Sequence, residues 1–352
     1  MKFKMAVAGF RHGHIFDIVA RTKDNPVLTL VAACEEDEQT RAFIEEKGIV
    51  KITHTDYKKM LESVECDIIA IGDCYGKRGE IAIEALKKGR HIISDKPLCT
   101  RISEIKEIAR ICAEKNLKVG CQLNMRNMAQ FIGLRNLIKS GDLKEIHSII
   151  FTGHHPLMLD SRPSWYFQPG MHGGTINDIG IHAIDYILWA TGMKFSKINA
   201  ARSWNAFAKK YPHFKDAGQM MLSMENGCGV LGDVSYFSPD SHGYNLRFYW
   251  RFVVYGTGGI AETSATAKNI IFAQSGKTEV SILQLPASDD GGYLRDFLDD
   301  IRGATGPERL KTQDVIIASY ITLLIQHAGD ENKREIDITD LPVFYNGSPL
   351  KL

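Results

Sequence analysis

The sequence predicts an α/β fold, with a doubly wound parallel sheet followed by an α+β domain that has a large, mostly antiparallel sheet. Residues 1–122 alternate short apolar strands with amphipathic helices, which is typical of a parallel sheet covered on both faces. In residues 123–352, strand-like runs are separated by turns such as Glu225-Asn226-Gly227, which favours an antiparallel sheet. A chain of 352 residues is also long for one hydrophobic core, so we expect two domains.

The expected elements of the first domain follow one another in a regular order. Strands are expected at residues 3–8, 28–33, near Ile52, 67–71, 91–94 and 118–122. Helices are expected at residues 15–21, 38–46, 56–63, 79–88 and 102–115. Each crossover between these parallel strands should be right-handed.

The second domain is expected to begin with a helix at 131–139, a strand at 146–153 and a loop rich in aromatic residues, Pro and Gly. Further helices are expected at 178–191, 293–302 and 313–328, and further strands at 217–224, 228–237, 249–255 and 270–272. The strands at 217–224 and 228–237 carry apolar residues at too many positions for a face exposed to water. We therefore expect a homodimer or homotetramer that covers this face of the C-terminal sheet.

Composition and charge argue against several classes of function. Lys and Arg total 43 against 42 Asp and Glu, so the excess of basic residues typical of nucleic-acid binding is missing. No apolar run is long enough to cross a bilayer, and no signal-peptide core precedes the first strand. The seven cysteines are scattered and form no C-x-x-C pair, which fits reduced thiols. We expect a cytoplasmic protein without nucleic-acid or membrane partners.

A candidate phosphate-binding turn follows the first strand and has the sequence Gly9-Phe10-Arg11-His12-Gly13-His14. The usual dinucleotide fingerprint has three glycines, whereas this turn keeps the first, has Arg11 and His14 in place of the others, and carries a displaced Gly13. Backbone N–H groups at a helix N-terminus bind phosphate, and Arg11 could add charge-assisted contacts to a pyrophosphate. A plain strand–helix turn is the alternative, but we assign all six residues to a cofactor.

The tip of the second strand carries Glu35, which is followed by Glu36 and Asp37. An acidic residue at this point hydrogen-bonds the adenosine ribose of NAD and repels the 2′-phosphate of NADP. We therefore expect NAD rather than NADP and assign Glu35 to the ribose, with a plain acidic helix N-terminus as the alternative. The other residues assigned to the cofactor are Gly72 and Asp73, which follow the strand at 67–71, and Asp95 with its neighbour Lys96.

Three side chains could supply the chemistry of an alcohol oxidation. Lys96 follows the strand at 91–94, where a cation would polarise the carbinol oxygen and stabilise the developing alkoxide. Asp178 and His182 are four residues apart and point to the same side of one expected helix. Histidine suits the role of base because it titrates near neutrality, and Asp178 would fix a substrate hydroxyl. The alternative is that Asp178 caps the helix and His182 is a polar residue beside the core.

Two segments resemble the glucose–fructose oxidoreductase / inositol dehydrogenase (Gfo/Idh/MocA) family. Residues 85–97 read ALKKGRHIISDKP, similar to the family's AL…GKHV..EKP, and residues 173–185 read GGTINDIGIHAID, similar to its GGG…D.G.H..D. The resemblance implies an N-terminal Rossmann domain, a sheet-based substrate domain and a substrate bound between them. It maps the family's catalytic lysine to Lys96, and its substrate-contacting aspartate and acid–base histidine to Asp178 and His182.

The resemblance also implies an NAD(P)-dependent oxidoreductase that transfers a hydride between nicotinamide and a secondary hydroxyl of a sugar, inositol or related polyol. Asp95 and Arg78 stand where the family has Glu and often has His. Arg126 resembles the family's arginine after the sixth strand and would bind cofactor or substrate, with a surface ion pair as the alternative. Trp165 is on the loop expected to roof the cleft, where it would stack on substrate or anchor the loop.

Two other functions remain open. Some members of the resembled family keep NAD bound and cleave glycosides by transient oxidation, and a non-catalytic NAD-binding regulator is the third possibility. Such a regulator would not need Lys96, Asp178 and His182 together. Histidines near this segment suggest a metal site, but the chain has no H-E-x-x-H motif and a hydride mechanism needs no metal, so we assign no ligand among His154, His155 and His172.

Overall fold

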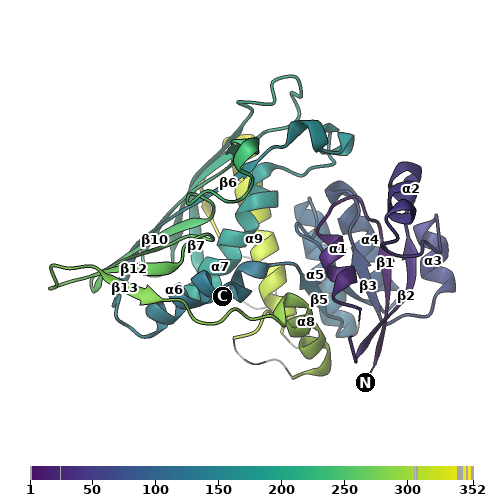
Figure 1. Cartoon of the computed structure of the whole chain (residues 1–352), viewed down its shortest axis with the longest axis horizontal. Coiled ribbons are helices and arrows are strands. Elements are labelled where there is room, and N and C mark those ends of the chain that lie inside the picture. Colours follow the sequence, from purple (N-terminus) through teal and green to yellow (C-terminus); the bar gives the residue numbers. More distant parts are fainter. Residues whose placement is uncertain are drawn as a thin grey trace.

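The computed structural model of the chain places two large sheets side by side, with helices packed between them and against their faces (Figure 1). It describes residues 2–23, 25–304, 306 and 308–338, and the backbone of residues 344–345 and 348–349. None of the helices formed by these residues is long and apolar enough to span a bilayer.

The first sheet confirms the predicted parallel arrangement, with five strands in the order β2-β1-β3-β4-β5. They are β1 (Phe3–Ala8), β2 (Leu28–Cys34), β3 (Ile68–Ile71), β4 (His91–Ser94) and β5 (Val119–Cys121). Every residue of β3 is buried, as expected for an apolar strand covered on both faces. The strand order reverses at β1, so the carboxyl ends of β1 and β3 form the crevice in which open α/β sheets bind ligands.

The helices of this domain are α1 (Ile15–Ala20), α2 (Glu38–Glu46), α3 (Tyr57–Ser63), α4 (Tyr75–Lys87) and α5 (Ile102–Lys115). Asp37 caps α2, because its carboxylate accepts the N–H of Thr40. Helix α4 begins at Tyr75, four residues before the prediction, because Gly76 and Gly79 weakened the helical pattern of the sequence.

The predicted strand near Ile52 is wrong. An isolated bridge between Cys34 and His54 takes its place beside β2 at the edge of the sheet. Lys51 and Thr53 on either side of Ile52 are exposed, so the segment lacks the continuous apolar run that buries the other strands.

The second sheet has nine strands in the order β13-β12-β11-β10-β6-β9-β8-β7-β14. They are β6 (Ile146–Pro156), β7 (Phe195–Trp204), β8 (Ala217–Met224), β9 (Gly229–Ser238), β10 (Arg251–Gly256), β11 (Gly259–Thr263), β12 (Asn269–Gln274), β13 (Ser281–Gln284) and β14 (Arg334–Asp337). Only β6 and β9 pair in parallel, so the predicted, mostly antiparallel sheet is confirmed. Strands β7, β11, β13 and β14 were not among those expected from the sequence, and the last three are only four or five residues long.

Helices cover one face of the second sheet, which is the face turned toward the first domain (Figure 1). They are α6 (Ala129–Lys139), α7 (Ile181–Thr191) and α9 (Thr312–Glu331), and α9 contacts both α7 and α5. The opposite face is open, and Met221 of β8 and Leu231 of β9 are each 48% exposed there.

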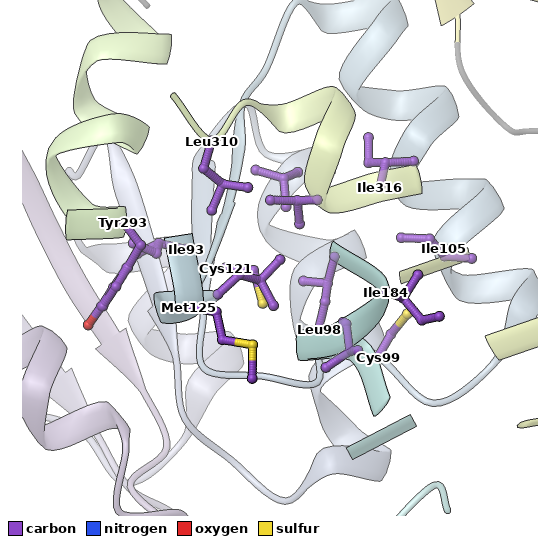
Figure 2. Packing of buried hydrophobic residues seen from close by; sticks show 14 of the residues in the cluster. Ile93, Leu98, Cys99, Ile105, Cys121, Met125, Ile184, Tyr293, Leu310 and Ile316 are labelled. Atoms are coloured by element: carbon purple, nitrogen blue, oxygen red, sulfur yellow. The ribbon is translucent and has the colours of Figure 1, made fainter. Parts of the chain in front are cut away.

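One hydrophobic cluster crosses from the first domain into the second (Figure 2). Ile93 and Cys121 of the first sheet share it with Ile184 of α7, Ile316 of α9 and Tyr293 of α8 (Gly292–Arg302). The C-terminal helices therefore pack against the N-terminal sheet. This shared core fixes the position of the second domain relative to the first. The predicted division at residue 122 stays a prediction, because the core is continuous across it.

Candidate active site

A cavity of about 290 Å³ lies where the carboxyl edge of the first sheet faces the second domain. Lys96, Asp178 and His182 meet in it, together with His12 and His14 of the turn after β1. Two roomier hollows, of about 550 and 590 Å³, contain none of these five residues. The remaining residues of the lining are Asn124, Met125, Met128, His155, Arg162, Tyr166, Tyr236, Tyr244, Tyr249 and Trp250.

Asp178 and His182 come from two different kinds of helix. Asp178 lies in a π-helical turn, Ile176–Gly180, and His182 lies in the first turn of α7, so the helix predicted over 178–191 is wrong at its start. Before the π turn, Gly174 has φ 93°, and a Cβ added to it would come within 2.2 Å of the Gln326 side chain, so glycine is required. The i,i+4 spacing of Asp178 and His182 in the sequence did not distinguish a π-helical turn from an α-helical one.

Lys96 and Asp178 form a buried ion pair. The Lys96 Nζ donates to Asp178 Oδ1 at 2.7 Å and to the Asp178 carbonyl at 3.0 Å, and both side chains are 3% exposed. The Tyr236 hydroxyl donates to Asp178 Oδ2, and His172 Nε2 lies 3.0 Å from the same hydroxyl. Burial alone would raise the pKa of the Asp178 carboxyl, but Lys96 and His172 hold it well below its usual value. Asp178 is therefore ionised and fixes the position of Lys96.

His182 lies beside this pair without a partner of its own. Its Nδ1 is buried and has no hydrogen-bond partner among the described residues, and its ring packs edge-on against Trp250 at 5.7 Å. Burial and the nearby charge of Lys96 lower the pKa of His182 well below its usual value. The imidazole is therefore neutral at neutral pH, which is the state a proton acceptor needs.

Arg78 organises the opposite wall through Asp95. Both side chains are fully buried, and Arg78 Nη2 lies 2.9 Å from Asp95 Oδ2. Arg78 also donates to the carbonyls of Asp73, Asp95 and Pro97 at 2.7, 2.9 and 3.1 Å, which ties together the chain segments after β3 and β4. Burial would raise the pKa of the Asp95 carboxyl, but Arg78 and His12 hold it well below its usual value.

The carboxylate of Asp95, which was assigned to the cofactor from the sequence, is enclosed by protein groups. His12 Nδ1 lies 2.5 Å from one oxygen and His14 Nδ1 lies 3.2 Å from the other. Asp95 thus positions two histidines that do line the cavity. The importance of Arg78 was missed by sequence reasoning, although a charged residue on the same helix face as Tyr75 and Ala82 was a usable signal.

Arg126 and Trp165, which were assigned to binding from the sequence, do not line this cavity, and each has partners within the protein. Arg126 is buried and pairs with Asp185 through both its Nε and Nη2, at 2.9 and 2.5 Å, and with Asp314 at 3.2 Å. The positive charge of Arg126 is therefore balanced by one buried and one half-buried carboxylate. Trp165 is 2% exposed and donates its Nε1–H to the Arg11 carbonyl at 3.3 Å, which anchors the loop as the alternative interpretation had it.

The turn after β1 has a conformation that only glycine permits at its start. Gly9 has φ 82°, and a Cβ on it would come within 2.6 Å of the Asp73 Cβ. The N–H groups of Arg11 and His12 both donate to the Gly72 carbonyl, at 2.9 and 3.2 Å. In the part of the chain that the structure describes, the N–H groups of Gly13 and His14 have no internal acceptor.

Glu35 and Phe10 face inward, contrary to their assignment to the cofactor. Glu35 is 1% exposed, and its two oxygens accept the backbone N–H of Phe10 at 2.6 Å and of Asp37 at 2.8 Å. The Phe10 side chain is buried in the core. The carboxylate thus satisfies the backbone of the turn, and the predicted pair of hydrogen bonds to ribose is not what its position supports.

His12, His14 and Asp95 place three ligand-type atoms within 4.8 Å of one another, the one such group found among the described residues. The carboxylate of this group already contacts Arg78, and a guanidinium at 2.9 Å opposes the binding of a second cation. His154, His155 and His172, among which no metal ligand was assigned from the sequence, are not part of this group.

Two family descriptions match the chain over most of its length. Residues 3–123 match "Oxidoreductase family, NAD-binding Rossmann fold", and residues 131–262 match "GFO/IDH/MocA C-terminal domain". The chain belongs to the Gfo/Idh/MocA oxidoreductase family. This confirms the resemblance drawn from the two sequence segments.

Individual Gfo/Idh/MocA proteins are distant in sequence but match most of the chain. An inositol 2-dehydrogenase/D-chiro-inositol 3-dehydrogenase of Lactiplantibacillus plantarum is 21% identical over 93% of this chain and 91% of its own. A D-glucoside 3-dehydrogenase of Escherichia coli is 23% identical over 88% and 90%. The crystal structure of an NAD⁺-bound inositol dehydrogenase homologue of Azotobacter vinelandii superposes with a TM-score of 0.77, at 16% identity over 96% and 97%. At this identity the superposition supports the fold.

NAD is the cofactor that the family implies, and the crevice of the first sheet fits it. The glycine turn and Gly72 lie at the point where the strand order reverses, which is where Rossmann domains bind the pyrophosphate. The free N–H groups of Gly13 and His14 begin the chain segment that enters α1, and a Cβ on Gly13 would meet no atom within 4 Å. The turn is therefore open to a bound anion, and Arg11 and His12 are the side chains nearest to it in sequence.

Proposed function

We propose that this protein is an NAD-dependent dehydrogenase that oxidises a secondary hydroxyl of a sugar, inositol or related polyol. One observation carries the proposal. Lys96, which is buried and held by an ion pair with Asp178, lines the same cavity as His182, a neutral histidine whose Nδ1 has no partner among the described residues. These are the two groups that hydride removal from an alcohol requires beside the cofactor. The names of the inositol and glucoside dehydrogenases to which the chain is similar support the class of substrate.

The residues of the cavity divide the chemistry among them. NAD, when bound, supplies the hydride acceptor. Two of the three N–H bonds of Lys96 go to Asp178, so one remains to bind the carbinol oxygen and stabilise the alkoxide that develops there. His182 accepts the hydroxyl proton. Asp178 holds Lys96 in place, and Tyr236 holds Asp178 in turn.

Turnover is tested by following NADH formation with a panel of free sugars, inositols and alditols, with wild-type protein and Lys96→Met side by side. We expect a rise in NADH absorbance with at least one polyol and none with the variant. Cleavage of an aryl glycoside without net NADH would instead indicate the glycosidase alternative. No reaction of either kind, in a protein shown to bind NAD, would refute the proposed oxidation.

The preference for NAD over NADP is part of the proposal. Glu36 and Asp37 put two carboxylates just after β2, where they would repel a 2′-phosphate, whereas Glu35 is turned inward. Arg11 lies 3.3 Å from Asp37 and Arg41 donates to the carbonyls of Glu35 and Glu36, so both guanidinium groups have partners. Calorimetric titration should give tighter binding for NAD, and equal or tighter binding of NADP would contradict this assignment.

The open face of the second sheet is proposed as the interface of a homodimer or homotetramer. Met221, Leu231, Ile260 and Ile282 are each more than 40% exposed on its strands, an apolar surface that a second copy would cover. Light scattering should give a multiple of the 39.4 kDa chain mass, and the variant Met221→Lys/Leu231→Lys should shift it toward the monomer. A monomeric wild-type mass at micromolar concentration would rule this out.

A cytoplasmic location also remains a proposal. All seven cysteines are free and buried, which is typical of a reducing compartment. Cell fractionation with a tagged protein would test it.

A further inference from the structure

The cavity contains one positive charge that no acidic residue balances. Lys96 is paired with Asp178, whereas Arg162 has no carboxylate within ion-pair distance among the residues that the structure describes. Arg162 Nε donates to the Leu157 carbonyl at 2.7 Å, and Nη2 lies 3.3 Å from the Pro156 carbonyl. A half-buried guanidinium without a counter-charge is costly unless a ligand supplies one.

The guanidinium lies close to the reacting groups. Its central carbon is 4.9 Å from the centre of the Tyr166 ring and 5.8 Å from that of Tyr236, whose hydroxyl holds Asp178. Its one further hydrogen bond to the described residues is long, at 3.5 Å from Nη1 to the Tyr166 hydroxyl. An arginine has five N–H donors, so at least two remain for a ligand in the cavity.

A second unpartnered group lies in the same wall. His155 is 8% exposed, and its buried Nε2 has no hydrogen-bond partner in the described part of the chain. Its ring stands edge-on to the rings of Tyr244, Tyr249 and Trp250, at 5.5, 5.2 and 5.9 Å, so packing fixes its direction. A buried polar nitrogen held in this way costs free energy until a ligand atom meets it.

We propose that the substrate is a sugar acid, such as an aldonic or uronic acid, and that Arg162 and His155 bind its carboxylate while Lys96 and His182 act on a hydroxyl. This inference rests on the proposed function and narrows its class of substrate. A carboxylate presents two oxygens in one plane, which a guanidinium pairs side by side. Its single negative charge matches the one unbalanced charge of the cavity, whereas a phosphate ester would bring up to two.

The test is a set of matched pairs titrated into the NADH-loaded protein and followed by cofactor fluorescence or calorimetry. Four epimeric six-carbon aldonates, D-gluconate among them, are each compared with the alditol that has a CH₂OH in place of the carboxylate. We expect at least one aldonate to bind about 10- to 100-fold more tightly than its alditol, the range for a charge-assisted hydrogen-bonding site. If no aldonate in the panel exceeds its alditol, or if D-glucitol 6-phosphate exceeds them all, the inference is overturned.

Variants connect the preference to the two residues. Arg162→Gln should reduce the advantage of the aldonate to less than about threefold, and Arg162→Lys should keep part of it, because a point charge replaces a planar fork. His155→Leu tests the site without disturbing the backbone contacts of Arg162, and it should also reduce the advantage. An advantage that survives both Arg162→Gln and His155→Leu would contradict the assignment.

Arg135→Gln is the matched control. Arg135 also stacks on an aromatic ring, Trp189, and donates Nε to a backbone carbonyl, but it lies on α6 outside the cavity. It should leave the preference unchanged. A preference for aldonates without NADH formation from any of them would refute the proposed oxidation but support the carboxylate site at Arg162 and His155. Equal binding and equal turnover of aldonates and alditols would support the proposed oxidation and refute the preference for sugar acids.

Discussion

The two walls of the cavity differ in how far the protein satisfies its own polar groups. On the wall formed by the first sheet, Asp95 is contacted by His12, His14 and Arg78, so its carboxylate is fully occupied. On the wall formed by the second domain, His155 and His182 each have a buried ring nitrogen without a partner. The buried side chains around Asp95 are paired before any ligand binds, whereas His155 and His182 would gain a partner only from a ligand.

This difference follows from the elements that carry each wall. The first wall stands at the ends of parallel strands β1, β3 and β4, whose register is fixed by the sheet and whose ends are tied together by Arg78. The second wall stands on β6, β9, α7 and the segment before β10, where aromatic rings set the direction of each polar side chain. The rigid ends of the parallel strands suit the binding of a cofactor that is the same in every turnover. The side chains oriented by packed aromatic rings suit the recognition of a particular substrate.

The largest effect on activity is expected from replacing His182, on the wall formed by the second domain. His182→Ala should lower kcat by about 10²–10⁴-fold, because the hydroxyl proton loses its acceptor, while NAD binding changes little. Steady-state kinetics on the best polyol or sugar acid, with NAD titrated separately by fluorescence, measures both. Near-wild-type kcat in the variant would place the proton acceptor on another residue.

A substitution on the wall formed by the first sheet should instead lower the stability of the folded protein. Arg78→Met leaves the buried carboxylate of Asp95 without its main partner, so we expect a loss of about 3–5 kcal/mol in the free energy of unfolding. Arg110→Met is the control, since Arg110 forms exposed pairs with Glu107 and Glu114 on α5, and its loss should lower the free energy of unfolding far less. Urea unfolding of both variants decides the matter. A similar small loss in each would mean that the Arg78 network does not stabilise the wall.

A smaller and more specific effect is expected in the pH profile. Burial and Lys96 lower the pKa of His182, so the imidazole stays neutral, and competent as a base, at pH values where an ordinary histidine is protonated. With a pKa near 6.5, a histidine base would lose about fourfold in activity between pH 7.5 and pH 6. We expect kcat/KM to fall less than about twofold over this interval and to decline only at lower pH. A fourfold decline centred near pH 6.5 would show that His182 is not perturbed in this way.

The sequence predicted the backbone framework and the reacting trio better than it predicted side-chain direction. Lys96 at the end of a strand and the 178–182 spacing were enough to bring the right groups together, since strand ends of one sheet share an edge. Glu35 and Asp95 were placed at the cofactor, yet both turn inward to satisfy buried donors. A one-dimensional pattern shows that a carboxylate is near a turn, but packing decides whether it faces ligand or backbone.

The residues missed on the second wall have the same physical cause. Tyr236 lies near the end of β9, and the adjacent Tyr249 and Trp250 come just before β10. The pairing of β9 and β10 on either side of β6 brings them beside His155, which lies far from them in the sequence. Arg162 lay in a loop noted only for its aromatic content. Its meaning depends on the absence of a nearby acid among the described residues, which no sequence pattern contains.

The central claim, that this cavity moves a hydride from a carbinol carbon to NAD, can be tested directly with isotopes. The protein is incubated with NAD and a panel of sugars, alditols and aldonates deuterated at every carbon, and the reduced cofactor is analysed by mass spectrometry. The account predicts NADH one mass unit heavier than normal with at least one compound, and none with Lys96→Met. Unlabelled NADH, or its absence with every compound, would contradict it.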